Sequence, residues 1–122
     1  MIKPDKLLLL CFLLLGLTAC TRQDNFTSAK WDSTKDGVTF VERDEIVNDL
    51  IQHHQLKGLK YRKIVQLLKY PQYKDSTSFY YEILNTYNNM HQHKRIKNLV
   101  FHMTKDSVIT DVQIYDKQFK QK

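Results

Sequence analysis

The sequence predicts an α+β fold: a two-layer sandwich in which an N-terminal helical hairpin packs on a three-stranded antiparallel β-meander. Between residues 43 and 71, apolar residues recur at helical spacing in two runs separated by a glycine. After residue 77 they alternate with polar residues, which is the period of a strand with one buried face. Helices followed by consecutive strands are typical of an α+β domain.

The chain opens with a segment that is typical of bacterial lipoproteins. Two lysines precede an apolar run over Leu7–Leu17, which is shorter than the ~20 apolar residues of a transmembrane helix. Leu17–Cys20 reads Leu-Thr-Ala-Cys, a lipobox that ends in the cysteine to be lipidated. We therefore predict a signal peptide over 1–19, palmitate-type acylation of Cys20, and anchoring in the bacterial cell envelope, at the outer membrane.

The remaining chain divides into three parts. Polar composition predicts a lipidated flexible tether over 20–38, in which Trp31 is expected to dock on the folded domain. A single small α+β domain is predicted over 39–116 and a basic tail over 117–122. Because Cys11 leaves with the signal peptide and the second cysteine is acylated, we expect neither a disulfide nor thiol catalysis.

The first predicted helix begins near Arg43. Acidic residues lie in its first turns, where the positive end of the helix dipole stabilises negative charge. One stripe of this helix carries its buried side chains: Ile46, Val47, Leu50, Ile51 and His54. Gly58 is expected to take the left-handed conformation that ends the helix.

The second predicted helix begins near Lys60 and ends before Pro71, because proline disfavours helix at the preceding residue. Its stripe consists of Tyr61, Ile64, Val65 and Leu68. A helix of this length is unstable alone, so we expect it to pack on the sheet.

These segments resemble patterns of a family of small bacterial lipoproteins. Arg43–Ile51 is similar to R-x-x-M-x-x-D-L-I, and Gly58–Pro71 is similar to G-M-[ST]-x-x-E-V-x-x-L-L-G-x-P. Phe26–Trp31 looks like the F-D-x-x-K-W segment of some small relatives. On these residues the chain resembles the SmpA/OmlA-like outer-membrane assembly lipoproteins, which have a BLIP-like fold.

The resemblance implies an α+β fold and a non-catalytic role in the assembly of outer-membrane β-barrels. Several positions differ from the pattern, and two of these differences bear on the second helix. Lys60 stands where the family has a Ser or Thr helix cap, whose loss typically costs ~1 kcal/mol. Lys69 stands where the family has a glycine.

Three strands are predicted, and in each the inward residues alternate: Phe79, Tyr81 and Ile83; Leu99, Phe101 and Met103; Val112 and Ile114. A long Asn- and His-rich hairpin loop is expected over 85–94. The third strand is predicted over Val108–Tyr115. Because Ile109 is out of phase with this alternation, we expect a bulge or a late strand start.

Positive charge gathers in and after the hairpin of a chain with net charge +6. The predicted contacts to a protein partner or to anionic lipid headgroups are Lys60, Arg62, Lys63, Lys69, Tyr80 and Tyr87. Tyrosine is favoured at interfaces because it buries area at little entropic cost. The alternative is a solvated basic face with tyrosines of ordinary strand composition. Export excludes nucleic acid as the partner of the basic residues.

The sequence predicts no catalytic residue, metal site, cofactor or small-molecule substrate. The side chains of His53 and His54 diverge on a helix. His91 and His93 could share the face of an extended strand and bind a metal, but no third ligand is placed nearby. Serines fall in loops, outside any nucleophile elbow.

Two main functions follow from these expectations. The first is a non-catalytic, membrane-anchored envelope lipoprotein that acts as a protein-binding or scaffold module, in outer-membrane assembly or integrity. The alternative is a dedicated inhibitor or immunity lipoprotein that binds a single protein target. A metal-binding or enzymatic domain is a third hypothesis.

Overall fold

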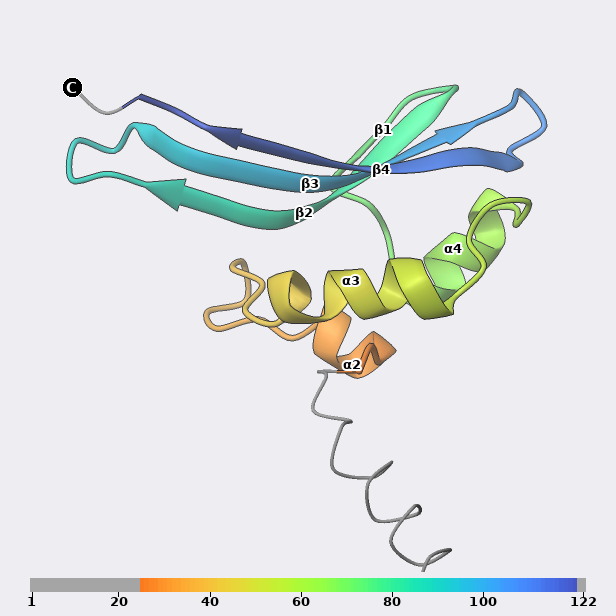
Figure 1. The fold of residues 1–122 in the computed structure, drawn as a ribbon, viewed down its shortest axis with the longest axis horizontal. Coiled ribbons are helices and arrows are strands. Elements are labelled where there is room, and N and C mark those ends of the chain that lie inside the picture. Colours follow the sequence, from red (N-terminus) through yellow and green to blue (C-terminus); the bar gives the residue numbers. More distant parts are fainter. Residues whose placement is uncertain (1–24, 121–122) are drawn as a thin grey trace, which may run out of the picture.

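The computed structural model describes residues 25–120, in which three helices pack on one face of an open, four-stranded antiparallel meander (Figure 1). The helices are α2 (Ser28–Trp31), α3 (Arg43–His53) and α4 (Tyr61–Leu68). The strands are β1 (Tyr73–Lys74), β2 (Ser78–Tyr87), β3 (His93–Met103) and β4 (Ile109–Gln118), which lie in this order in the sheet. The predicted signal peptide and Cys20 lie outside the described residues, so lipidation stays a prediction.

The predicted α+β class is confirmed, but the predicted numbers of elements, two helices and three strands, are wrong. The described residues form three helices and four strands. The additional strand, β1, pairs with the start of β2 through Tyr73 opposite Tyr80. The turn between β1 and β2 is held by Asp75, whose Oδ1 accepts hydrogen bonds from the backbone N–H groups of Thr77 and Ser78 at 2.9 and 2.8 Å. This turn and β1 lie between Pro71 and Phe79, where no strand was predicted.

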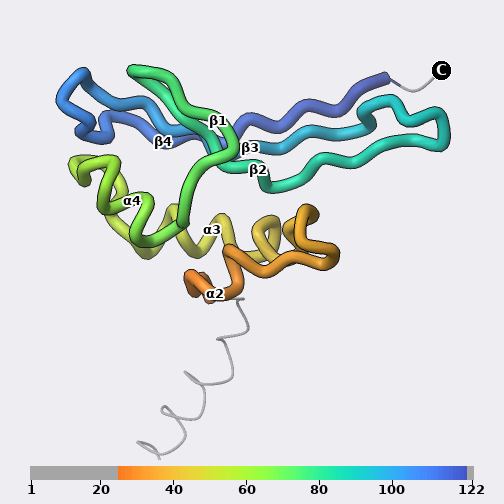
Figure 2. The backbone as a smooth tube through the Cα atoms, turned by 180° about the vertical axis from the view of Figure 1, so that it is seen from behind, coloured from red at the N-terminus to blue at the C-terminus, as the bar shows by residue number. Residues whose placement is uncertain are grey.

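The predicted tether is shorter than expected, because its second part belongs to the folded domain. Thr27 caps α2 by accepting a hydrogen bond from Lys30 N–H at 3.1 Å. Trp31 is fully buried, as its predicted docking requires, and its ring lies 5.9 Å from that of Tyr81 on the sheet. α2 lies on the side of α3 that faces away from the sheet (Figures 1 and 2). The packed domain therefore begins at Phe26, not at residue 39.

The core lies between the helical layer and the inner face of the sheet. The predicted inward residues of β2 and β3 are all buried: Phe79, Tyr81, Ile83, Leu99, Phe101 and Met103. On α3 the first part of the predicted stripe is buried, namely Ile46, Val47 and Leu50. Ile51 and His54 are exposed, contrary to the prediction, although the ring of His54 lies 5.2 Å from that of Phe26.

Gly58 has a positive φ of 87°, as predicted, but it does not end α3. It lies in the loop before α4, and its N–H donates to the carbonyl of Ile109 at 2.8 Å. Tyr61 N–H donates to the carbonyl of Ser107 at 2.8 Å, which satisfies a free donor at the start of α4. The turn before β4 therefore caps α4, whose N-cap Lys60 makes no side-chain capping bond.

The long strands differ from the predicted ones at their far ends. β2 and β3 take up half of the loop expected over 85–94 and leave a turn over 88–92. β4 begins at Ile109, and its register against β3 shifts between Ile109 and Asp111, so the predicted irregularity is confirmed. β4 also continues through Gln118, so the basic tail predicted over 117–122 begins inside a strand. The sequence did not reveal these extensions, because they consist mainly of polar residues. The strand ends extend beyond the helical layer and bury little apolar surface.

Arg43 connects the two layers with a buried guanidinium group. Its Nε donates to the carbonyl of Trp31 at 2.7 Å, and its Nη1 donates to the carbonyl of Glu82 at 2.7 Å. Nη1 also donates to Gln72 Oε1 at 3.1 Å, and the ring of Phe40 covers the group at 3.2 Å. Burial lowers the pKa of Arg43 to about 10, which leaves it charged at neutral pH.

Candidate functional site

Four of the predicted contact residues lie together on α4 and its two caps, in what we call the α4 patch: Lys60, Arg62, Lys63 and Lys69. All four are exposed, and among residues 25–120 none of them forms an ion pair. Two neighbouring lysines are engaged. Lys57 lies 3.7 Å from a carboxylate oxygen of Asp111, and the Nζ of Lys74 lies 5.1 Å from the ring centre of Tyr61. The α4 patch therefore presents unneutralised positive charge to solvent.

Lys69 has a backbone conformation that favours glycine. Its φ is 67° and its ψ is −163°, a region in which a Cβ atom is strained. Two hydrogen bonds hold this conformation. The N–H of Lys69 donates to the carbonyl of Val65 at 2.8 Å, and the hydroxyl of the buried Tyr81 donates to the carbonyl of Lys69 at 2.6 Å.

Tyr80 lies on a different surface, the outer face of the sheet. Its ring stacks on that of Tyr73 with centroids 5.5 Å apart and an interplanar angle of 22°. Tyr73 OH donates to Asp75 Oδ2 at 3.3 Å, and the charge of this carboxylate raises the pKa of Tyr73. The two tyrosines form a small aromatic platform over β1 and β2.

Tyr87 lies seven residues further along β2, about 23 Å from Tyr80 at the rise of a strand. It borders a cavity of about 530 Å³ at the end of the sheet that extends past the helices, which we call the distal pocket. The pocket is lined by Leu84, Thr86, Tyr87, Lys94, Arg95, Gln118 and Phe119. Its lining combines aromatic rings with two cations and contains no carboxylate.

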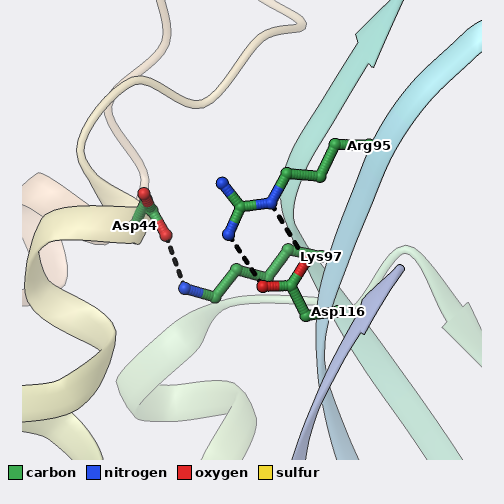
Figure 3. Close-up of polar contacts among 4 residues, drawn as sticks. All are labelled: Asp44, Arg95, Lys97 and Asp116. Atoms are coloured by element: carbon green, nitrogen blue, oxygen red, sulfur yellow. Dashed lines mark hydrogen bonds and ion pairs between the residues drawn. The ribbon is translucent and has the colours of Figure 1, made fainter. Parts of the chain in front are cut away.

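Two ion pairs set the charge around the distal pocket (Figure 3). Arg95 donates two hydrogen bonds to the carboxylate of Asp116, at 3.0 and 2.7 Å, which lower the pKa of Asp116. Nearer the helices, Lys97 Nζ donates to Asp44 Oδ1 at 2.6 Å and joins β3 to α3. Lys94 forms no ion pair with any residue in the described part of the chain, so it leaves a positive charge at the pocket.

Aromatic contacts fix the outer wall of the distal pocket. The His93 ring lies 4.8 Å from the ring of Tyr87 and 6.0 Å from that of Phe119, and His93 Nδ1 contacts Asn85 Oδ1 at 3.0 Å. His91 has a positive φ of 59° in the turn, so the extended pair of histidines that a metal would require is not formed. Residues 25–120 hold no group of three or more side chains suited to a metal ion.

The predicted contact residues thus occupy three surfaces: the α4 patch, the outer face at Tyr80 and the distal pocket at Tyr87. The sequence interpretation missed Lys94, Arg95 and Phe119 of the distal pocket, since it placed Lys94 in a loop and Phe119 in a tail and assigned Arg95 to no element. The alternation of Leu84 and Thr86 after the bulge in β2 was the available signal, and two register shifts obscured it.

The chain matches no protein-family model, and searches of curated proteins and of solved structures also find no match. None of the helices in the described part is long and apolar enough to cross a membrane.

Proposed function

We propose that this protein is a non-catalytic lipoprotein of the bacterial envelope that holds a protein-binding domain close to its membrane. The observation that carries the proposal is the short distance in sequence between the predicted anchor and the folded domain. Phe26 is largely buried, and its N–H donates to Asp49 Oδ2 at 2.7 Å. Ser28 Oγ donates to the carbonyl of Leu67 at 2.8 Å, which fixes α2 on α4 as well.

Only six residue positions separate Cys20 from Phe26. A fully extended chain spans at most about 3.5 Å per residue, so an anchor on Cys20 reaches about 20 Å from Phe26. A tether that ran to residue 38 would reach about 60 Å. The lipid therefore confines the domain to the membrane surface, and the helical layer lies on the side that faces the membrane.

This geometry assigns different roles to the three surfaces. α2 lies on the side of α3 that faces away from the sheet, so a tether that turned the outer face toward the membrane would have to pass two helices, each about 10–12 Å across, and then the sheet, which is farther than 20 Å. We place the α4 patch nearest the membrane, where it meets anionic headgroups or a membrane-bound partner. The distal pocket and the outer face remain accessible to a protein partner.

The distal pocket is the surface that we assign to the partner. Concave sites with apolar walls and a few oriented polar groups are favoured for binding. With Tyr87 and Phe119 as walls and Lys94 unneutralised, this pocket suits an acidic segment of a protein. The family resemblance implies that the partner belongs to the outer-membrane β-barrel assembly machinery.

The test is photocrosslinking in living cells from two positions of the lipidated chain. A benzophenone side chain replaces Tyr87 at the distal pocket or Gln113 on the outer face, and Lys94→Glu is combined with the first probe. We expect one dominant protein adduct from position 87 that Lys94→Glu removes, and intact mass should show acylation at Cys20. Equal adducts from both positions, or an unacylated chain, would contradict the proposal. An adduct with a single enzyme or toxin would favour the inhibitor hypothesis.

A further inference from the structure

β4 is an edge strand whose outer edge is mostly unpaired. At its start the loop before α4 covers Ile109, because Gly58 N–H donates to the Ile109 carbonyl and Ile109 N–H donates to the Leu59 carbonyl, both at 2.8 Å. From Thr110 to Gln118, no described residue pairs with the edge that faces away from β3. Such an edge is a template for another strand.

We propose that a second copy of this chain pairs with this edge in antiparallel fashion, so that one sheet runs through both copies. The free edge spans residues 110–118, and its middle residue is Ile114. Full overlap of two identical antiparallel edges therefore places a two-fold axis at Ile114. In a symmetric dimer each contact on one side of the axis occurs again on the other.

The outer face of β4 carries two opposite charges that meet in this register. Asp111 lies opposite Lys117 of the second copy, and the symmetry repeats this pair of opposite charges. Both residues lie on the outer face, since the inward position between them is Ile114, which pairs with the buried Leu99. Opposite charges that face each other across strands stabilise the pairing, while like charges oppose it.

Apolar surface at the centre of the edge supports the same pairing. Ile114 and Tyr115 are 37% and 48% exposed. In the dimer Ile114 lies opposite Ile114 of the second copy, and Tyr115 lies opposite Gln113. The exposure of Ile114, which the alternation of β4 predicts to be inward, is then explained by a neighbour that covers it.

The direction of the anchors agrees with this symmetry, and here the inference rests on the proposed lipid anchor. A two-fold axis between paired edge strands stands perpendicular to the sheet, so the outer faces of both copies point the same way. α2 and the start of the domain lie on the opposite side in each copy (Figures 1 and 2). Both anchors can therefore enter one membrane, which a dimer formed by packing outer face on outer face would not allow.

Confinement to a membrane also compensates for a small interface. A single pair of nine-residue edges buries less surface than a typical stable dimer, so association in dilute solution is expected to be weak. Two tethered domains in one membrane meet at a much higher effective concentration. The dimer should therefore be tested in the membrane and not in dilute extract.

The experiment is oxidative crosslinking of the full, lipidated chain in native membranes. Ile114→Cys introduces the only free thiol, given removal of Cys11 and acylation of Cys20. Residues opposite each other in an antiparallel pair lie within the Cα distance of a disulfide. Gln66→Cys on the exposed face of α4 is the matched control. Asp111→Lys, Lys117→Asp and the double exchange are each combined with Ile114→Cys.

We expect at least fivefold more disulfide-linked dimer from position 114 than from position 66. Each single charge reversal should reduce the yield, and the double exchange should restore it, which a misfolded variant would not do. Yields no higher than those of the control, yields unaffected by single reversals, or adducts with a different protein would overturn the dimer. Intact mass of the same sample reports acylation of Cys20, so failure of the anchor is seen separately from failure of the pairing.

Discussion

Replacement of Lys69 by glycine should stabilise the folded domain. Lys69 ends α4 with φ 67° and ψ −163°, a conformation in which the Cβ atom of any L-residue is strained. The conformation is imposed by the surrounding structure, because the backbone of Lys69 is bonded on both sides, to Val65 and to Tyr81. Glycine keeps both backbone hydrogen bonds and removes the strain.

The size of the effect follows from two opposing contributions. Strain of this kind destabilises the folded state by about 1–3 kcal/mol. Glycine loses more backbone entropy on folding, which offsets about 0.5–1 kcal/mol of the gain. The net stabilisation is therefore about 1 kcal/mol, which for a domain of this size raises the midpoint of thermal unfolding by about 4–8 °C.

The assay is urea and thermal unfolding followed by fluorescence, with the non-lipidated variant Cys20→Ser as the background. The chain has one tryptophan, Trp31, and its complete burial makes its emission a direct report of unfolding. Lys69→Ala is the control, because it removes the same charge but keeps a Cβ atom. We expect Lys69→Gly to be more stable than both other forms. If Lys69→Ala is as stable as Lys69→Gly, charge repulsion within the α4 patch and not backbone strain explains the gain.

Three further predictions use the same unfolding assay. Arg43→Met should destabilise the domain by about 3 kcal/mol, since it leaves the carbonyls of Trp31 and Glu82 without a donor; a change below about 1 kcal/mol would contradict this. Truncation of the side chain of buried Leu50 to alanine should cost about 2–5 kcal/mol, whereas Ile51→Ala at the exposed neighbouring position should cost much less. The hydrogen bond from Phe26 N–H lowers the pKa of Asp49, so this carboxylate stabilises the fold above its unfolded pKa of ~3.9 and loses that contribution as pH falls through the folded value. Asp49→Asn should therefore be less stable than wild type at pH 7, with a smaller difference at pH 3; an equal difference at both values would exclude the carboxylate as the cause.

Where one face of a strand is covered by the helical layer, the sequence predicted the buried residues of that strand. The inward residues Phe79, Tyr81, Leu99 and Phe101 alternate because the helical layer lies over them, and burial is what produces a readable period. The irregularity at the start of β4 was also predictable, because Ile109 is buried out of phase.

Several of the errors have a common physical cause, which is that polar residues took part in ordered structure through hydrogen bonds and not through burial. The turn held by Asp75 and the cap of α2 by Thr27 stand in segments whose composition is typical of loops. The far ends of β2, β3 and β4 are built from polar residues that pair with one another beyond the helices. The distal pocket could not be predicted for this reason, since most of its residues come from segments that were assigned to a loop or a tail.

Two positions of the resembled pattern coincide with structural requirements that only a few residues meet. The pattern begins with arginine, and Arg43 supplies a planar group that donates to acceptors from both layers. The pattern places glycine before x-P, and Lys69 there has the backbone conformation of a glycine. A lysine that is retained at the expense of stability is expected to serve a contact. On this argument Lys69→Gly should stabilise the domain and at the same time weaken the association of the α4 patch with the membrane or with a membrane-bound partner. A variant that gains stability with unchanged membrane association would show that the charge at this position is dispensable.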